Sequence, residues 1–113
     1  MKKKEIRVRC WIDINGTRFF GPGRSDLLKL IDETGSIAKA ARTMGMSYKK
    51  AWDMVGEMNM KGKTPLVISQ KGGSKGGGAS LTETGKKVVL AYDRLAKKLN
   101  TVVSKESALL KLI

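Results

Sequence analysis

Basic and polar side chains able to bind a polyanion gather in the middle of the chain. Ser47 can cap a helix that begins at Tyr48, and Lys49 and Lys50 follow in its first turn. Lysine ammonium groups bind phosphates and guanine acceptors, while a carboxylate such as that of Asp53 accepts from a cytosine amine. This is the chemistry of recognition rather than of bond cleavage. The residues predicted to contact double-stranded DNA are Ser36, Lys39, Arg42, Ser47, Tyr48, Lys49, Lys50, Asp53, Lys71 and Lys75.

Some of these side chains have alternative roles. Tyr48 can reach a phosphate or a thymine methyl group, or it can pack into the core, and the sequence favours neither. Asp53 can instead form an ion pair with a neighbouring lysine. Trp52 follows helical spacing with Val55 and Met58, which predicts that it lies in the core.

Two short helices separated by a glycine are predicted over residues 36–61. Helices that cross steeply at a short turn need a small residue such as Ala41 at the crossing, and Gly45 supplies a turn with positive φ. The pattern indicates a helix-turn-helix, whose second helix contacts base edges. A plain helical hairpin is the alternative. Lys39 and Arg42 are predicted to contact phosphates, and a solvated helix face is the alternative for them.

The segments that follow complete the predicted architecture. Residues 66–81 are expected to form a wing, a β-hairpin whose glycine-rich tip lets Lys71 and Lys75 approach a phosphate backbone. A disordered linker is the alternative. Thr82 can cap a last helix over residues 82–113, in which poor helix formers near Asn100 favour fraying or a kink.

An N-terminal hairpin is predicted over residues 1–23. Apolar residues alternate with polar ones over residues 6–14, the period of a strand with one buried face, and Asn15-Gly16 suits a tight turn. Ser25 is then predicted to cap a helix that ends at Gly35.

Length and composition favour one packed domain. The sequence has 113 residues, of which 41% are hydrophobic and 29% charged, which is typical of a soluble globular fold. Residues 1–113 are therefore predicted to form a single domain, mainly α with small antiparallel β hairpins. The expected fold is a winged helix-turn-helix with a long C-terminal dimerisation helix.

The charge points to a polyanionic partner. Lys and Arg number 23 against 10 Asp and Glu, giving a formal net charge of +13. Nucleic acid is the first choice of partner, and an anionic membrane surface is the second.

Enzymatic and metal chemistry have little support in the sequence. Histidine is absent and Cys10 is the single cysteine, so the commonest general base, an internal disulfide and a thiolate metal site are all missing. We expect no enzyme activity, no cofactor and no metal. Because neither a membrane span nor a signal peptide is evident, a cytoplasmic protein is expected.

One set of short motifs carries a family resemblance. Most of the chain from Leu27 to Leu99 follows the pattern in order, and the Ser-Tyr-Lys-x-Ala-Trp-Asp run with its later glycine-rich segment is specific. The matching residues are Thr34-Gly35-Ser36-Ile37, Ala40-Ala41, Gly45-Met46-Ser47-Tyr48-Lys49, Ala51-Trp52-Asp53, Glu57-Met58-Asn59, Gly72-Gly73, Lys75-Gly76-Gly77-Gly78, Leu81-Thr82 and Gly85.

These residues resemble the N-terminal DNA-binding domain of the ModE family of molybdate-responsive transcription regulators. The resemblance implies a winged helix-turn-helix, a dimer and transcriptional control through an operator. Full-length members also carry C-terminal oxyanion-binding domains, whereas the 113-residue sequence supplies no persuasive pocket for a tetrahedral anion. We therefore expect no molybdate binding by this chain.

A symmetric homodimer is predicted from an apolar stripe in the last helix. Its members recur at alternating spacings of four and three residues, which is the pattern of a helix that packs against a partner. Coverage of the chain's own core is the alternative. The predicted dimer interface consists of Val88, Tyr92, Leu95, Leu99 and Val102.

Two other functional classes remain open at the level of sequence. The charge alone fits a nonspecific nucleic-acid-binding module of the nucleoid or RNA type, although few aromatic residues and a buried Trp52 argue against single-strand readers. A dimeric partner-binding protein without DNA specificity is the other class, and failure to bind any duplex at low salt would select it.

Overall fold

The computed structural model describes residues 2–70 and 78–113. Within them the chain is mostly helical, with two small antiparallel sheets, as predicted. Four strands form two hairpins: β1 (Ile12–Ile14) with β2 (Thr17–Phe20), and β3 (Val67–Ser69) with β4 (Ala79–Leu81). The helices of the described residues are α1 (Pro22–Thr34), α2 (Ile37–Met44), α3 (Tyr48–Lys61), α4 (Glu83–Ser104) and α5 (Ser107–Lys111).

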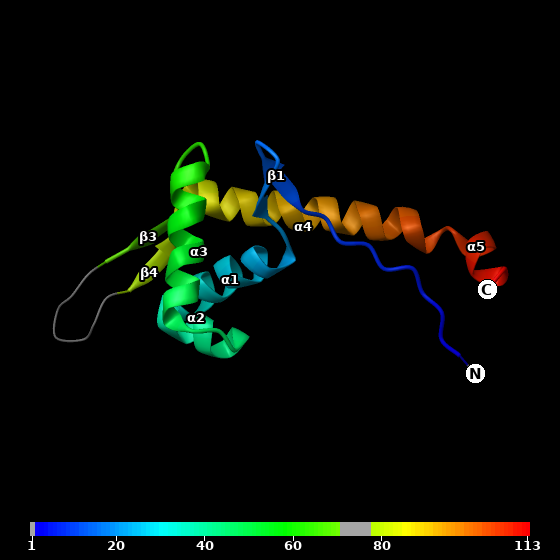
Figure 1. The fold of residues 1–113 in the computed structure, drawn as a ribbon, viewed down its shortest axis with the longest axis horizontal. Coiled ribbons are helices and arrows are strands. Elements are labelled where there is room, and N and C mark those ends of the chain that lie inside the picture. The colour runs from blue at the N-terminus through cyan, green and yellow to red at the C-terminus, as the bar shows by residue number, and fades with distance from the viewer. Residues whose placement is uncertain (1, 71–77) are drawn as a thin grey trace.

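The molecule is elongated because one long helix leaves the packed body. Helices α1, α2 and α3 form the body with the β3–β4 hairpin at its end, while the second half of α4 and α5 extend away from it (Figure 1). The N-terminal segment runs beside α4 toward the same end. The extents are 60 × 33 × 22 Å, and the radius of gyration is 17.1 Å. A compact domain of this length has a radius of gyration of about 13 Å.

The ends of α2 and α3 are set by local signals that the sequence predicts correctly. The Ser36 hydroxyl accepts from the Lys39 amide at 3.1 Å, and the Ser47 hydroxyl accepts from the Lys50 amide at 3.0 Å. Gly45 ends α2 in the left-handed region with φ of 71°. The two helices are therefore separated by a short turn that favours glycine.

The core lies where the three short helices meet the hairpins and the first half of α4. Helix α1 contributes some of the most buried side chains of the core. The small residues Ala40, Ala41 and Ala51 let α2 and α3 approach closely. The buried hydrophobic residues are Phe20, Leu27, Leu28, Ile31, Ile37, Ala40, Ala41, Ala51, Val55, Met58, Leu66, Val67, Leu81, Val89 and Tyr92.

A single asparagine joins α3 to the β3–β4 hairpin. The Asn59 side chain accepts from the amides of Leu66 and Val67 at 2.9 and 3.1 Å and donates to the Val67 carbonyl at 2.9 Å. Since these groups lie at the start of β3, Asn59 fixes the hairpin relative to the end of α3.

The first strand is much shorter than the alternation predicts. Pairing begins only at Ile12, opposite Phe20, and residues 2–11 belong to no helix or strand. The returning strand β2 is short because Pro22 starts α1 directly after it. The turn itself is as predicted, with positive φ at Asn15 and Gly16.

Ser25 does not cap α1, so that prediction is wrong. The helix begins at Pro22, whose fixed φ suits the first turn, and the Ser25 amide already donates to the Gly21 carbonyl at 2.9 Å. Ser25 lies inside the helix, and 2% of its surface is exposed. The C-terminal end at Gly35, with φ of 69°, agrees with the prediction.

The C-terminal segment is two helices rather than one. Helix α4 ends at Ser104, and α5 follows after Lys105 and Glu106. The Ser104 hydroxyl donates to the Thr101 carbonyl at 2.9 Å, a local bond that competes with helix continuation. The break lies just after the poor helix formers where a kink is predicted.

Candidate nucleic-acid interface

The start of α3 presents two aromatic rings to solvent. Tyr48 is 54% exposed and Trp52 40% exposed, and their rings stack with centroids 6.1 Å apart and planes 23° apart. The prediction that Trp52 lies in the core is wrong. The buried face of α3 follows Ala51, Val55 and Met58, and Trp52 lies about 100° around the helix from Ala51.

Lys49 and Asp53 form an ion pair on the same exposed surface. The Lys49 Nζ lies 2.9 Å from the Asp53 Oδ2, at the i,i+4 spacing of a helix face. The hydrogen bond that Lys49 donates to Asp53, together with the negative charge of that carboxylate, raises the pKa of Lys49 above its usual value. The lysine therefore remains charged, but its nearest counter-charge is already within the protein.

Three other predicted cations are exposed and lie outside the ion pairs formed among residues 2–70 and 78–113. They are Lys39 and Arg42 of α2 and Lys50 of α3. The predicted contacts Ser36 and Ser47 are the N-caps of these same two helices. The structure thus gathers these predicted residues on α2 and α3, whereas Lys71 and Lys75 lie outside the described residues.

The β3–β4 hairpin projects from the same end of the molecule as α3 (Figure 1). Its register pairs Val67 with Leu81 and Ser69 with Ala79. The Ala79 amide donates to the Gly35 carbonyl at 2.9 Å, which fixes the start of β4 to the end of α1.

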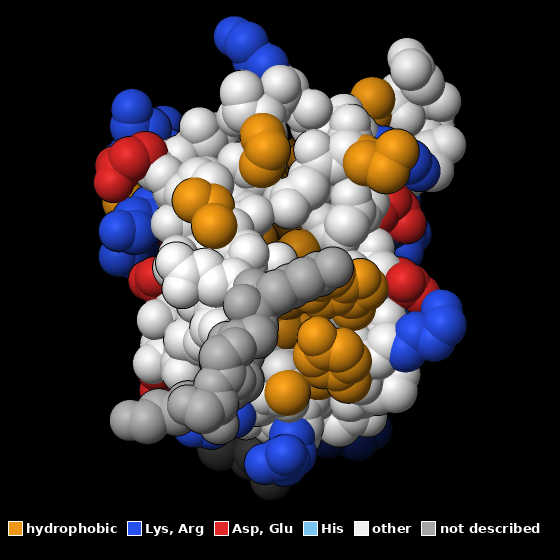
Figure 2. Space-filling view, turned by 90° about the vertical axis from the view of Figure 1, so that its left-hand side faces the viewer, with side chains coloured by type: hydrophobic (Ala, Val, Ile, Leu, Met, Phe, Trp, Pro, Cys, Tyr) orange, Lys and Arg blue, Asp and Glu red, His pale blue; other side chains and the backbone are white. Residues whose placement is uncertain are grey.

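Seen from that end, the surface combines apolar and basic groups. Figure 2 shows hydrophobic side chains exposed near the middle of this face, with Lys and Arg side chains, and some Asp and Glu side chains beside them, at its margins. Such a face can bind a polyanion through its cations and contact apolar groups of the ligand in between.

The predicted dimer stripe divides between the core and the surface. Tyr92 is buried in this chain's own core, edge-on to Phe20 with ring centroids 5.2 Å apart, so it is not available as an exposed interface residue. Val88 also packs against the core, and Leu99 is half-buried. Leu95 and Val102 are 39% and 61% exposed. The first residues of the stripe lie in the core and later ones are exposed to solvent, because the second half of α4 extends beyond the body.

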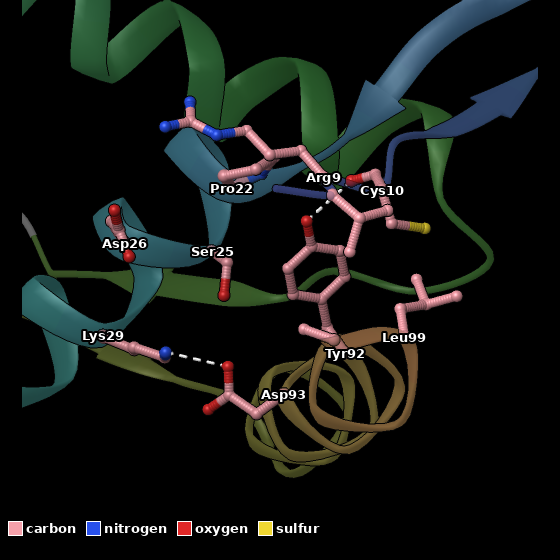
Figure 3. A pocket seen from close by; sticks show the side chains of 11 residues that line it. Arg9, Cys10, Pro22, Ser25, Asp26, Lys29, Tyr92, Asp93 and Leu99 are labelled. Atoms are coloured by element: carbon pink, nitrogen blue, oxygen red, sulfur yellow. Dashed lines mark hydrogen bonds and ion pairs between the residues drawn. The ribbon is translucent and has the colours of Figure 1, made fainter. Parts of the chain in front are cut away.

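A cavity of about 320 Å³ lies where the N-terminal segment meets α1 and α4. Its lining includes Ser25, whose buried Oγ has no hydrogen-bond partner among the described residues, and the ion pair between Lys29 and Asp93 at 2.8 Å (Figure 3). The Tyr92 hydroxyl donates to the Cys10 carbonyl at 2.6 Å beside it. Sequence reasoning missed this junction because its partners are far apart along the chain.

Two capped helices joined by a glycine turn, then a two-stranded hairpin and a long helix, define a helix-turn-helix protein whose architecture is consistent with a winged helix. Among the described helices, none is long and apolar enough to cross a membrane. No family profile matches the chain. Individual relatives do match, and they show that the chain belongs to the ModE family, corresponding to the N-terminal part of its members.

Three relatives illustrate the similarity. The DNA-binding transcriptional dual regulator ModE of Escherichia coli K12 is 46% identical over 79 residues, which cover 70% of this chain and 30% of that protein. The molybdenum transport protein ModE of Azotobacter vinelandii is 40% identical over 113 residues, covering 90% and 42%. The molybdenum-pterin-binding protein MopB of Rhodobacter capsulatus is 50% identical over 72 residues, covering 64% and 27%. The chain therefore spans less than half the length of these relatives.

Proposed function

We propose that this protein is a transcriptional regulator that binds a specific double-stranded DNA operator as a homodimer. The observation that carries the proposal is the two-sided character of α3. One face, through Ala51, Val55 and Met58, is buried in the core, while the N-terminal half presents Tyr48 and Lys50 to solvent. A helix held in this way is suited to lie in a major groove. The E. coli relative is named as a DNA-binding transcriptional regulator, which supports the same partner.

Each exposed group of the motif has a role in this proposal. Lys50 contacts a guanine or a nearby phosphate, and Tyr48 contacts a thymine methyl group or a phosphate. Lys39 and Arg42 of α2 bind the DNA backbone. Ser36 and Ser47, at the N-terminal ends of α2 and α3, lie close to phosphates, which the N-terminus of a helix attracts. Asp53 accepts from a cytosine amine through Oδ1, because Lys49 is paired with its Oδ2 in the free protein.

The β3–β4 hairpin is proposed to act as the wing. Lys71 and Lys75 then meet phosphates and add affinity more than sequence choice. Replacing both with alanine is expected to lower the slope of log affinity against log salt by about 0.9 per lost phosphate contact. An unchanged slope would place the hairpin away from the DNA backbone.

The dimer is proposed to form through the part of α4 that leaves the body. Leu95, Leu99 and Val102 lie there, and two-fold symmetry would direct the two α3 helices toward half-sites about 34–36 Å apart. Sedimentation equilibrium of Leu95→Asp tests this. Leu90→Asp is the matched control, because Leu90 is 63% exposed on the same helix but outside the stripe. A Leu95→Asp protein that stays folded and fully dimeric would refute the interface.

The decisive experiment for the function is selection of bound duplexes from a random library. Recovery of a recurrent inverted repeat is expected, because a symmetric dimer reads two identical half-sites. Selection of no common sequence, despite binding at low salt, would instead identify a nonspecific nucleic-acid-binding protein.

The exposed aromatic pair favours a second candidate, binding of single-stranded nucleic acid. Bases stack on exposed aromatic rings, and the outer faces of Tyr48 and Trp52 are open to such contacts. Competition between a selected duplex and its separate strands distinguishes the two. Preference for the strands, lost in Trp52→Leu, would support this candidate over the operator.

A further inference from the structure

The N-terminal segment over residues 2–11, here called the basic arm, lies against α4 without belonging to either sheet. The hydrogen bond from the Tyr92 hydroxyl to the Cys10 carbonyl attaches it near the middle of the helix. Beyond that point Val8 lines the same cavity as Ala96 and Leu99. The chain then continues toward the end of the molecule that holds the C-terminus (Figure 1). The arm is therefore positioned by the fold rather than only tethered to it.

The alternation of the arm separates its apolar and basic side chains. Ile6, Val8 and Cys10 are half-buried, whereas Arg7 and Arg9 between them are exposed. The only carboxylate in the arm is that of Glu5. Among the described residues, no arm cation is part of an ion pair. The exposed cations of the arm are Lys2, Lys3, Lys4, Arg7 and Arg9.

This arrangement restricts what can cover the arm. Ile6, Val8 and Cys10 are turned into the protein, and Trp11, which is 45% exposed, has Arg18 over its ring, so the apolar surface open to a lipid layer is small. Pairing with the arm of a second copy would place arginine opposite arginine, and like charges directly across a strand pair are destabilising. A ligand with closely spaced negative charges, such as a nucleic-acid backbone, can neutralise the exposed lysine and arginine side chains of the arm.

We propose that the basic arm is a second DNA contact that binds backbone phosphates away from the reading helix. The inference rests on the proposed function and adds a surface that lies far from α3. The arm lies against the part of α4 that carries Ala96 and Leu99, and the N-terminus lies at the opposite end of the molecule from the β3–β4 hairpin (Figure 1). In a dimer formed through α4, both arms lie near the two-fold axis and contact phosphates between the half-sites.

The test compares three variants of the full chain on the operator recovered by selection. Arg7→Gln with Arg9→Gln removes four arginines from the bound dimer and is expected to reduce the slope of log affinity against log salt by about 3.6, since each phosphate neutralised contributes about 0.9. The recognised sequence is expected to stay the same. Arg7→Lys with Arg9→Lys keeps the charge and is expected to keep most of the slope. Lys63→Gln with Lys97→Gln removes two exposed cations elsewhere and serves as the control.

Phosphate ethylation interference locates the contact. Ethylation between the half-sites is expected to weaken binding of the parent and to have little effect on the glutamine variant. A glutamine variant with the salt slope and interference pattern of the parent would overturn the arm contact while leaving the operator function intact. A parent that selects no operator would remove both proposals.

A lipid target is distinguished by vesicles of anionic phospholipid at the same salt concentrations. Vesicle binding that disappears in the glutamine variant, together with an unchanged DNA salt slope, would assign the arm to a membrane surface and overturn the DNA contact. Matching thermal unfolding midpoints of all variants are expected, because the substituted side chains are exposed.

Discussion

The Tyr92 hydroxyl donates a 2.6 Å hydrogen bond to the main-chain carbonyl of Cys10, across 82 residues of sequence. Burial of the Tyr92 ring raises the pKa of its hydroxyl, so this group remains a proton donor at neutral pH. The bond joins the basic arm to α4 at the edge of the core.

Removing that hydroxyl is expected to loosen the arm. Tyr92→Phe keeps the buried ring against Phe20 and deletes the bond, which is expected to cost about 0.5–1.5 kcal/mol in the free energy of unfolding. Urea unfolding measures the loss. Tyr48→Phe is the matched control, because the hydroxyl of Tyr48 is on an exposed side chain.

The three hydrogen bonds of Asn59 predict a large effect from one substitution. Asn59→Ala leaves the amides of Leu66 and Val67 without their side-chain acceptor in a part-buried site. We expect a loss of about 2–4 kcal/mol, since an unsatisfied buried polar group costs about 1–3 kcal/mol. Chemical denaturation checks this. A loss similar to that of the exposed Gln70→Ala control would show that the hairpin is held by its apolar contacts instead.

Two helical glycines are expected to respond in opposite directions to alanine. A Cβ at Gly85 would collide with the main chain at Leu66, so Gly85→Ala must displace the start of α4 or the strand beside it. A Cβ at Gly56, within α3, meets open space. We expect Gly85→Ala to destabilise the protein and Gly56→Ala to stabilise it by about 0.5–1 kcal/mol. Thermal unfolding of both variants checks the contrast.

The ion pair between Arg24 and Glu57 predicts a pH dependence of stability. The hydrogen bond from Arg24, at 3.0 Å, with its charge, lowers the pKa of Glu57 below its ordinary value near 4.5. Folding therefore favours the carboxylate, so the contribution is present above the unfolded pKa and is lost as pH falls through the folded pKa. The stability difference between the parent and Glu57→Gln is expected to shrink from neutrality to about pH 2. A constant difference would contradict this.

The lysines of α3 that are proposed to face DNA are expected to differ in their contributions to binding. Lys50→Ala is expected to cost about 1–3 kcal/mol of binding and to relax the preference at one base pair, if the contact is to a base edge. Lys49→Ala is expected to cost less binding free energy, because the Asp53 Oδ2, 2.9 Å from the Lys49 Nζ, already neutralises part of its charge. Anisotropy titrations at fixed salt measure both. Equal binding by both variants and the parent would contradict the assignment of α3 as the reading helix.

The sequence predicts best what neighbouring residues decide. Ser36 and Ser47 cap the helices that follow them, and Gly35 and Gly45 end helices with positive φ, because each signal acts within a few residues. These signals place the predicted cations of α2 and α3 on one motif.

What the sequence misses depends on packing at a distance. Trp52 has helical spacing with buried residues, yet the small side chain of Ala51 defines the face that packs against the body. Tyr92 belongs to a regular apolar stripe, but its burial is decided by Phe20 and by the arm that crosses it. Ser25 is a good cap by type, whereas Pro22 starts the helix earlier. Each outcome depends on a contact or backbone restraint that local periodicity does not contain.

The position of Cys10 allows its thiol to report whether the arm is docked on α4. It is the one cysteine in the printed sequence, and its thiol is free and half-buried. Its main-chain carbonyl accepts the hydrogen bond from the Tyr92 hydroxyl. A thiol-reactive dye will therefore label a single site, at a rate that increases whenever the arm leaves α4. Detachment and docking of the arm can be followed in real time, without an engineered label, during the same titration that measures binding.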